Sequence, residues 1–398
     1  MSGDLKYVPT KDEWKKIGDD VITLDLDAFA PHEASPHEAS PHEASPHEAS
    51  PSVVPVVPPS VVPPREAPAP HETKAPISSL FRCANALVLS SGGIKGTVLL
   101  GSLYYLQSTK QYSEFLQNIH VFSGSSVGCI ISYLMIIGFS PLEIISDLFT
   151  NPLKLDHAIN FTSILKNEGL YKWSMIEDKI RQMTLKKLKY IPTLEDIYTT
   201  YKKILICTTY NKTKNKLIYM TSETHGGLSI LTVLKMACAI PIVFEEFVYR
   251  GDVYIDGAIA DHLPVKMTDD YMKRYILENT VDSGVSFDPG VSFETYSILA
   301  LNIKRKPSKK THAKKQHVSK DTKFSFGMES IIDFLSNIYS IIDIPMSIIE
   351  KTMTEGCSKN VKIINIEPGP AGMFDFVASV KNMLSLFVHG YRKCKEVL

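Results

Sequence analysis

The sequence predicts an α/β fold, with a mostly parallel central sheet and helices on both faces. Short apolar runs of strand length alternate with segments of helical periodicity, which is the order of elements in a parallel sheet. These runs are apolar at nearly every position, as strands are when helices cover both faces of their sheet. Glycine-rich turns follow some of the runs, where strand leads into helix.

Residues 1 to about 78 precede this pattern and are expected to form an extended or disordered tether. Residues 31–50 repeat the pentad Pro-His-Glu-Ala-Ser four times, and more than half of the 24 prolines fall between Pro31 and Pro76. Proline removes a backbone donor and clashes with helix, so frequent prolines oppose packed structure. We interpret the repeated histidines as part of a spacer, because a five-residue period in an extended chain spreads the imidazoles apart.

The first predicted strand, residues 84–90, ends in the glycine-rich turn Ser91 to Gly96 (SGGIKG). A helical pattern follows through Leu99 and Leu106. Such a turn exposes consecutive backbone N–H groups, which can bind an anion. That anion is either a phosphate or an oxyanion formed at a nearby nucleophile, although the spacing matches neither a P-loop nor a dinucleotide-binding turn.

The second predicted strand, Ile119 to Phe122, leads into a G-x-S-x-G sequence and an apolar helix. Ser126 is expected on a tight strand-to-helix turn, where Gly124 and Gly128 allow close approach of the backbone. The positive end of the following helix favours negative charge near the serine hydroxyl. These features predict a nucleophile, with an ordinary turn before a buried helix as the alternative.

The middle of the chain supplies further elements and a carboxylate. Helices are expected at 141–149, 171–185, 194–201 and 230–239, and strands at 203–209, 216–220 and 253–256. The last of these strands delivers Asp256 onto a turn formed by Gly257 and Ala258.

Residues 271–398 are expected to complete the fold that residues 84–270 begin. The expected strands are at 296–303 and 361–366, and the expected helices at 328–353 and 374–397. Between them lies a basic run, from Lys304 to Lys323, with a single acid. Such a run is usually a solvated loop. It could also contact anionic lipid headgroups, at about 1 kcal/mol per basic residue, and nuclear targeting is a third reading.

The composition excludes a general attraction for nucleic acid. Hydrophobic residues make up 44% of the chain and charged residues 22%, and the formal net charge is zero, so no global field recruits a polyanion or a membrane. The six cysteines stand singly, which favours a reduced, intracellular protein, either cytoplasmic or peripheral on membranes. We expect neither a signal peptide nor a transmembrane helix.

Three motifs occur in order along the chain: the glycine turn at 91–96, G-x-S-x-G at 124–128 and Asp-Gly-Ala at 256–258. Together they resemble the motifs of the patatin-like phospholipase family of lipid acyl hydrolases. The segments that begin at Gly169 and Ala239 also resemble sequences found in members of this family. The resemblance covers about residues 84–270, and it implies a patatin-like fold and a lipid substrate.

The resemblance further implies that Ser126 is the nucleophile and Asp256 the general base of a Ser-Asp dyad without histidine. The implied oxyanion hole consists of Gly92, Gly93 and the backbone N–H groups of Ile94 and Lys95. Serine needs such a base, and donors aimed at the oxyanion usually contribute the largest catalytic effect. The expected cycle forms an acyl-enzyme from a phospholipid or acylglycerol ester, which water then hydrolyses. No metal, calcium included, or other cofactor is expected.

Two positions depart from the usual family pattern. Ser91 stands where a third glycine is common, and Val127 where alanine is common. Neither removes a group that the chemistry needs. One alternative is a Ser-His-Asp esterase, whose histidine would be His389, since His262 follows Asp256 by only six residues. The other is a weakly active or inactive lipid-binding or scaffolding protein with the same fold.

Overall fold

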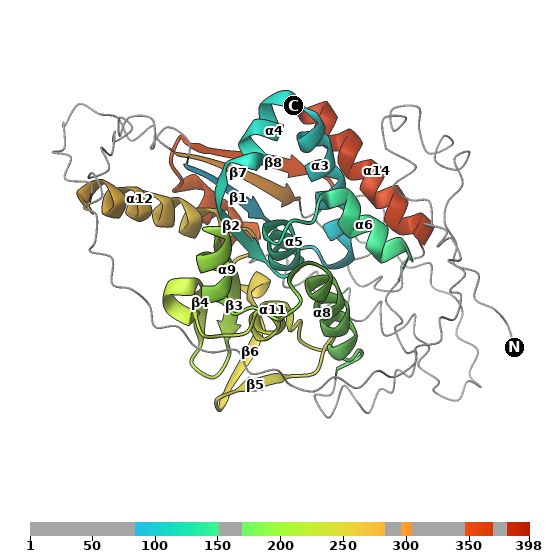
Figure 1. Ribbon diagram of the computed structural model, residues 1–398, viewed down its shortest axis with the longest axis vertical. Helices are drawn as coiled ribbons and strands as arrows, with labels where there is room; N and C mark the ends of the chain where they lie inside the picture. The colour runs from blue at the N-terminus through green and yellow to red at the C-terminus, as the bar shows by residue number, and fades with distance from the viewer. Residues whose placement is uncertain (1–83, 151–168, 283–295, 305–346, 369–379) are drawn as a thin grey trace, which may run out of the picture.

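A single mixed sheet organises the described part of the chain (Figure 1). The computed structural model describes residues 84–150, 169–282, 296–304, 347–368 and 380–398. The eight strands described are β1 (Ala84–Leu89), β2 (Ile119–Ser125), β3 (Ile204–Asn211), β4 (Lys216–Met220), β5 (Phe247–Tyr249), β6 (Asp252–Asp256), β7 (Tyr296–Ile303) and β8 (Val361–Ile366).

The sheet is parallel over most of its width, as the sequence predicted. Hydrogen bonds connect the strands as β5-β6-β3-β2-β1-β7-β8, and β4 also pairs with β3. All neighbours from β3 to β8 in this order are parallel, whereas β4, β5 and β6 are joined antiparallel. The parallel strands are connected through helices, which is the arrangement expected of crossover connections.

Helices cover both faces of this sheet (Figure 1). The longer ones are α3 (Gly96–Ser108), α4 (Lys110–Gln117), α5 (Val127–Ile136), α6 (Pro141–Thr150), α8 (Ser174–Leu188), α9 (Leu194–Tyr201), α11 (Ile230–Cys238), α12 (Val265–Asp282) and α14 (Val380–Val397). Short helices are η3 (Gly93–Lys95), α10 (Ser222–His225) and η4 (Gly257–Ile259), and residues 347–355 are also helical. No single described helix is both long and apolar enough to cross a bilayer, and the pair α5 and α6, which reach that length together, bend by 113° at their break.

Alternate side chains of β1 enter two separate cores. Leu87 and Leu89 pack in the larger core, under α3 and α5, whereas Ala86 and Val88 pack in the smaller core, under α12. The sequence run is therefore continuously apolar because both faces are buried.

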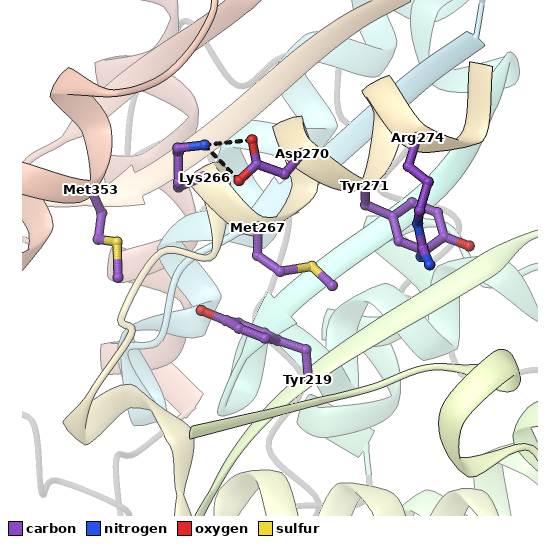
Figure 2. A pocket seen from close by; sticks show the side chains of 7 residues that line it. All are labelled: Tyr219, Lys266, Met267, Asp270, Tyr271, Arg274 and Met353. Carbon is purple, nitrogen blue, oxygen red and sulfur yellow. Dashed lines mark hydrogen bonds and ion pairs between the residues drawn. The ribbon is translucent and has the colours of Figure 1, made fainter. Parts of the chain in front are cut away.

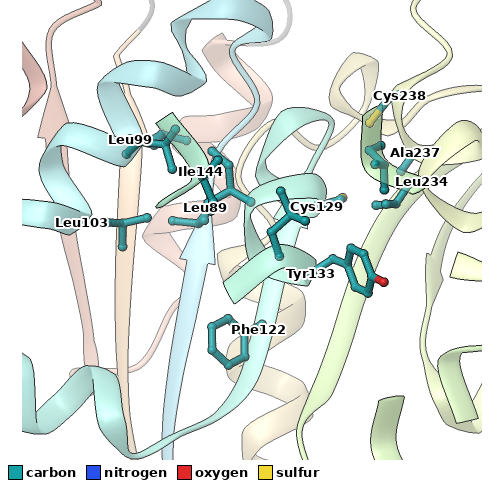
Figure 3. Packing of buried hydrophobic residues seen from close by; sticks show 14 of the residues in the cluster. Leu89, Leu99, Leu103, Phe122, Cys129, Tyr133, Ile144, Leu234, Ala237 and Cys238 are labelled. Carbon is teal, nitrogen blue, oxygen red and sulfur yellow. The ribbon is translucent and has the colours of Figure 1, made fainter. Parts of the chain in front are cut away.

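The α12 side carries an open pocket of about 420 Å³ (Figure 2). Its lining includes Tyr219 of β4, Met267 and Arg274 of α12, and Met353 of the helix at 347–355. Neither Ser126 nor Asp256 lines this pocket. On the other side of the sheet, side chains from β1, α3, α5 and α11 form one apolar layer, part of which is shown in Figure 3.

Several elements differ from the sequence prediction. The strand β5 and the helices α4, α10 and α12 were not predicted. β2 extends to Ser125, beyond the predicted end at Phe122. The expected tether at 1–78, most of the basic run, the start of the expected helix at 328–353 and residues 374–379 lie outside the described residues.

Candidate active site

Ser126 occupies a sharp turn between the end of β2 and the start of α5. Its backbone torsions are φ 53° and ψ −126°, a conformation that a residue with a Cβ rarely adopts. Its neighbours explain the need for glycine on both sides. A Cβ at Gly124 would lie 2.5 Å from the carbonyl carbon of Gly128, and a Cβ at Gly128 would lie 2.4 Å from the carbonyl oxygen of Leu89. The local sequence thus holds the serine on a strained turn at the N-terminus of a buried helix.

Asp256 is the last residue of β6, and its backbone and carboxylate are both fixed. Its N–H donates to the Ala239 carbonyl at 3.0 Å, and its Oδ1 accepts from the Ala258 N–H at 2.8 Å. Gly257 follows where a Cβ would lie 2.4 Å from the carbonyl carbon of Thr208. Only 4% of Asp256 is exposed, the same fraction as for Ser126. Both side chains therefore lie in a poorly hydrated environment.

The register of β3 brings these two residues together. Ser125 of β2 pairs with Thr208, and Asp256 of β6 pairs with Thr209. β4 pairs with β3 from Cys207 to Asn211, so it occupies the other edge of β3 there. β2 and β6 must therefore share one edge. They run toward each other, so the residue after Ser125 and the last residue of β6 meet end to end.

The glycine turn after β1 lies against the same helix as the serine. A Cβ on Gly96 would approach Val127 Cγ2 to 2.7 Å, so the turn directly contacts the first residue of α5. Gly93 has φ 56°, which glycine adopts without strain. The Lys95 N–H donates to the Gly92 carbonyl at 3.0 Å. Of the four residues that sequence predicted for an oxyanion hole, Lys95 thus already uses its N–H within the turn.

A buried thiol that sequence reasoning did not single out lies near the serine and the carboxylate. It belongs to Cys238, the last residue of α11. Burial raises the pKa of Cys238, and nearby Cys129 and Asp256 raise it further, while nearby Ser126 acts the other way. The sequence signal that could have identified Cys238 was its position directly before Ala239-Ile240-Pro241, a segment that resembles sequences of the family.

The two candidate histidines are engaged elsewhere. Nδ1 of His262 lies 2.5 Å from Ser91 Oγ, and its Nε2 lies 3.2 Å from Asn302 Oδ1. His389 Nε2 contacts the Glu367 carbonyl at 3.0 Å, just after β8. β8 is separated from β2 by β1 and β7, which corresponds to roughly 14 Å across the sheet. This placement does not favour the Ser-His-Asp alternative that uses His389.

Within the described ranges, no group of three or more His, Cys, Asp or Glu side chains is arranged to hold a metal ion. The site offers a buried hydroxyl, a buried carboxylate and a glycine turn. The serine and the glycine turn follow the parallel strands β2 and β1, and the carboxylate belongs to the last residue of the antiparallel strand β6. These are the groups required for acyl transfer by a serine.

Comparison with known proteins gives one family. The model of the patatin-like phospholipase family matches residues 87–269. A probable lipid hydrolase of Invertebrate iridescent virus 6 is 33% identical over 192 residues, which are 47% of this chain and 64% of that protein. An uncharacterized protein of Acanthamoeba polyphaga mimivirus is 26% identical over 196 residues, 48% of this chain and 63% of that protein. The chain thus spans less than two thirds of each of these relatives.

Among solved structures, VipD from Legionella pneumophila aligns with 79% of this chain and 66% of its own, with a TM-score of 0.37 and 15% identity. The segment that matches the family model, residues 87–269, begins within β1 and ends within α12. It includes all three motifs that carry the resemblance.

Proposed function

Since residues 87–269 match the model of the patatin-like phospholipase family, we propose that this chain is a lipid acyl hydrolase with a Ser126-Asp256 dyad. The observation that supports the proposal is the register of β3, along one edge of which β2 ends at Ser125 and β6 ends at the buried Asp256. The substrates are carboxylic esters of phospholipids or acylglycerols.

In the proposed reaction, Ser126 Oγ attacks the ester carbonyl carbon while Asp256 accepts its proton. The carbonyl oxygen becomes an oxyanion, which the N–H groups of Gly93 and Ile94 stabilise together with the positive end of α5. Collapse of the intermediate breaks the ester bond, and the proton on Asp256 goes to the leaving alcohol or lysolipid. A water then attacks the acyl-enzyme, again giving a proton to Asp256, which passes it to Ser126 Oγ as the ester bond to the serine breaks and the fatty acid is released.

The Cys238 thiol is a second nucleophilic group near the serine and the carboxylate. Because burial keeps the thiol protonated, it does not compete as a nucleophile.

We also propose that the segment from Lys304 to Lys323 contacts anionic headgroups at the lipid surface. The positive charge there is local, since the chain as a whole is neutral. Such a contact would deliver the site to its substrate without a membrane-spanning segment.

The first experiment compares hydrolysis of a medium-chain p-nitrophenyl ester and of mixed phospholipid vesicles by the wild type and the variants Ser126→Ala and Asp256→Asn. We expect each variant to lose roughly 10³-fold or more in kcat, because a nucleophile and its base act as one unit. A long-chain alkyl fluorophosphonate should label the wild type and not Ser126→Ala.

Matched controls separate chemistry from folding. Ser125→Ala removes a neighbouring buried hydroxyl that has no hydrogen-bond partner among the described residues, and Asp252→Asn makes the same charge change at the opposite end of β6. Both should stay active. Wild-type protein that is folded but inactive on every ester class would contradict the proposal and favour a lipid-binding or scaffolding role.

A further inference from the structure

Ser91 links the oxyanion turn to His262 through two hydrogen bonds. The Ser91 N–H donates to the His262 carbonyl at 3.1 Å, and the Ser91 hydroxyl lies 2.5 Å from His262 Nδ1. Ser91 is 1% exposed and His262 is 6% exposed, so water does not compete for these bonds. Ser91 directly precedes Gly92 and Gly93, so the position of its backbone sets where that turn begins.

Asn302 of β7 fixes the direction of these hydrogen bonds. Its Nδ2 donates to Glu350 Oε1 at 2.6 Å and to Asn365 Oδ1 at 2.8 Å. Its Oδ1 therefore faces His262 Nε2, at 3.2 Å. An amide oxygen only accepts, so Nε2 carries the ring proton. His262 Nδ1 is then the acceptor, and the Ser91 hydroxyl donates to it.

The same short segment also holds the acid. The N–H groups of Ala260 and Asp261 both donate to the Gly257 carbonyl, at 3.0 Å and 2.9 Å. These bonds make a compact turn between Asp256 and His262. One end of this turn presents the carboxylate to Ser126, and the other end contacts the start of the glycine turn.

We propose that His262 is a positioning residue that sets the oxyanion turn relative to the dyad, acting through Ser91. This inference rests on the proposed hydrolase function and adds a specific role within it. His262 binds Ser91 on one side and Asn302 on the other, and thereby ties Gly92 and Gly93 to the turn that carries Asp256.

The expected consequence is kinetic, because oxyanion donors act only when they point at the position of the oxyanion. Losing one such donor costs roughly 10²–10³ in rate, and small displacements cost part of that. Loosening Ser91 should therefore lower kcat, while KM, which reflects the lipid-binding surface, should change little.

Two substitutions of His262 distinguish positioning from packing. The amide of Asn lies where Nδ1 was and can still accept from Ser91, whereas the amide of Gln lies where Nε2 was and can reach only Asn302. We therefore expect His262→Gln to lower kcat on the p-nitrophenyl ester by about 10- to 100-fold, with KM within about twofold. His262→Asn should lose several-fold less, although both variants remove the imidazole.

Ser91→Ala provides a second test that leaves the histidine in place. It keeps the backbone bond to the His262 carbonyl and removes only the hydroxyl, so it should lower kcat in the same direction as His262→Gln. The rate of labelling by a long-chain alkyl fluorophosphonate should fall in parallel with kcat. Urea unfolding reports whether each variant is folded.

Equal kcat losses in His262→Asn and His262→Gln, or a Ser91→Ala variant with wild-type kcat, would overturn the inference. These outcomes are distinct from failure of the proposed function, in which the wild type itself is inactive or Ser126→Ala retains activity. The Ser91→Ala result also decides the question if both His262 variants fail to fold.

Discussion

A methyl group of Val127 packs against Gly96 and so brings the segment after the serine into contact with the glycine turn. Val127 begins the helix that follows the serine, and its Cγ2 occupies the space that a side chain on Gly96 would need. The larger residue at position 127 is thus accommodated by the last glycine of the turn after β1. The sequence identified both positions separately, but their contact depends on how α3 and α5 pack, which no local pattern encodes.

We predict that Gly96→Ala lowers the free energy of unfolding by about 1–3 kcal/mol, because the new Cβ overpacks against Val127. Gly96 has ordinary helical torsions, so the backbone itself tolerates alanine. In a Val127→Ala background the same substitution should be neutral or slightly stabilising, since alanine favours helix over glycine. Urea unfolding of the four proteins measures this coupling, and additive effects of the two substitutions would contradict it.

At the scale of the element, strands with apolar residues at every position were predictable and helices with mixed faces were not. β1, β7 and β8 lie where the sequence placed them. β7 is almost entirely buried, whereas the edge strand β8 exposes Lys362 and Asn365 between its apolar residues. α12 was missed because polar Thr268 and Asp269 are fully buried on it, which breaks the apolar spacing of a helix. β5 was missed because its three residues are followed by Arg250 and Gly251 with φ 51° and 84°, a hairpin turn that usually has asparagine or aspartate first.

The candidate site likewise has a part that the sequence could predict and a part that it could not. Each motif could be recognised at its strand end, because glycine and a polar side chain stand out after an apolar run. The contacts among motifs could not be predicted. Cys238 lies near Ser126, and Ser91 binds His262, although the residues of each pair are more than 100 positions apart in the chain. Sequence spacing carries no information about such contacts.

Asp269 connects α12, β7 and the segment before β8. Its Oδ1 accepts from the Tyr296 hydroxyl at 2.7 Å and the Ser358 hydroxyl at 2.6 Å. Its Oδ2 accepts from Lys273 Nζ at 2.7 Å and the Ser358 N–H at 3.0 Å. Burial alone would raise the pKa of Asp269, but the hydrogen bonds from Lys273, Ser358 and Tyr296 together lower it below the ordinary value of 3.8.

We predict that Asp269→Asn lowers the free energy of unfolding at pH 7 by about 2–4 kcal/mol, because the ion pair with Lys273 is lost and the new NH2 group faces groups that now donate to the carboxylate. A lowered pKa means that the ionised carboxylate stabilises the fold above pH 3.8 and that this contribution is lost as pH falls through the lowered pKa. The difference from wild type should therefore shrink in acid.

Urea unfolding at pH 7 and near pH 3 checks this expectation. Asp270→Asn is the matched control, because Asp270 is the next residue of α12 and its ion pair with Lys266 is exposed, so its loss should cost less than about 1 kcal/mol. A difference between Asp269→Asn and wild type that stays constant across this pH range would count against a charged Asp269.

At the scale of the whole molecule, the proposed contact with a lipid surface depends on a local cluster of positive charge. The formal net charge is zero, so long-range attraction is weak, and the basic segment from Lys304 to Lys323 is the candidate contact. Lys304 itself directly follows β7 and donates its N–H to the Ile366 carbonyl at 2.8 Å. The segment therefore leaves the sheet at the carboxyl end of β7, the same end at which β2 delivers Ser126.

We predict that charge reversal in this segment weakens binding to anionic vesicles by tenfold or more, because each basic residue near the surface contributes up to about 1 kcal/mol. The variant reverses Lys309, Lys310, Lys314 and Lys315. The charge-matched control reverses four lysines that lie exposed on the described surface, namely Lys172, Lys189, Lys202 and Lys216. Vesicle sedimentation measures binding, and a soluble ester measures the intact site.

Equal binding of the two variants would show that net charge, rather than this segment, governs the lipid contact. Loss of soluble-ester activity in the first variant alone would show that the segment acts on the site itself. Either result would argue against headgroup binding by the segment.

The shared edge of β3 also determines when, during synthesis and folding, the proposed hydrolase can become active. Asp256 follows Ser126 by 130 residues, and it reaches the serine only after β6 has paired with β3. A chain still emerging from the ribosome, or one cut before β6, holds a serine without its base. On this geometry the proposed hydrolase stays inactive until β6 has paired with β3.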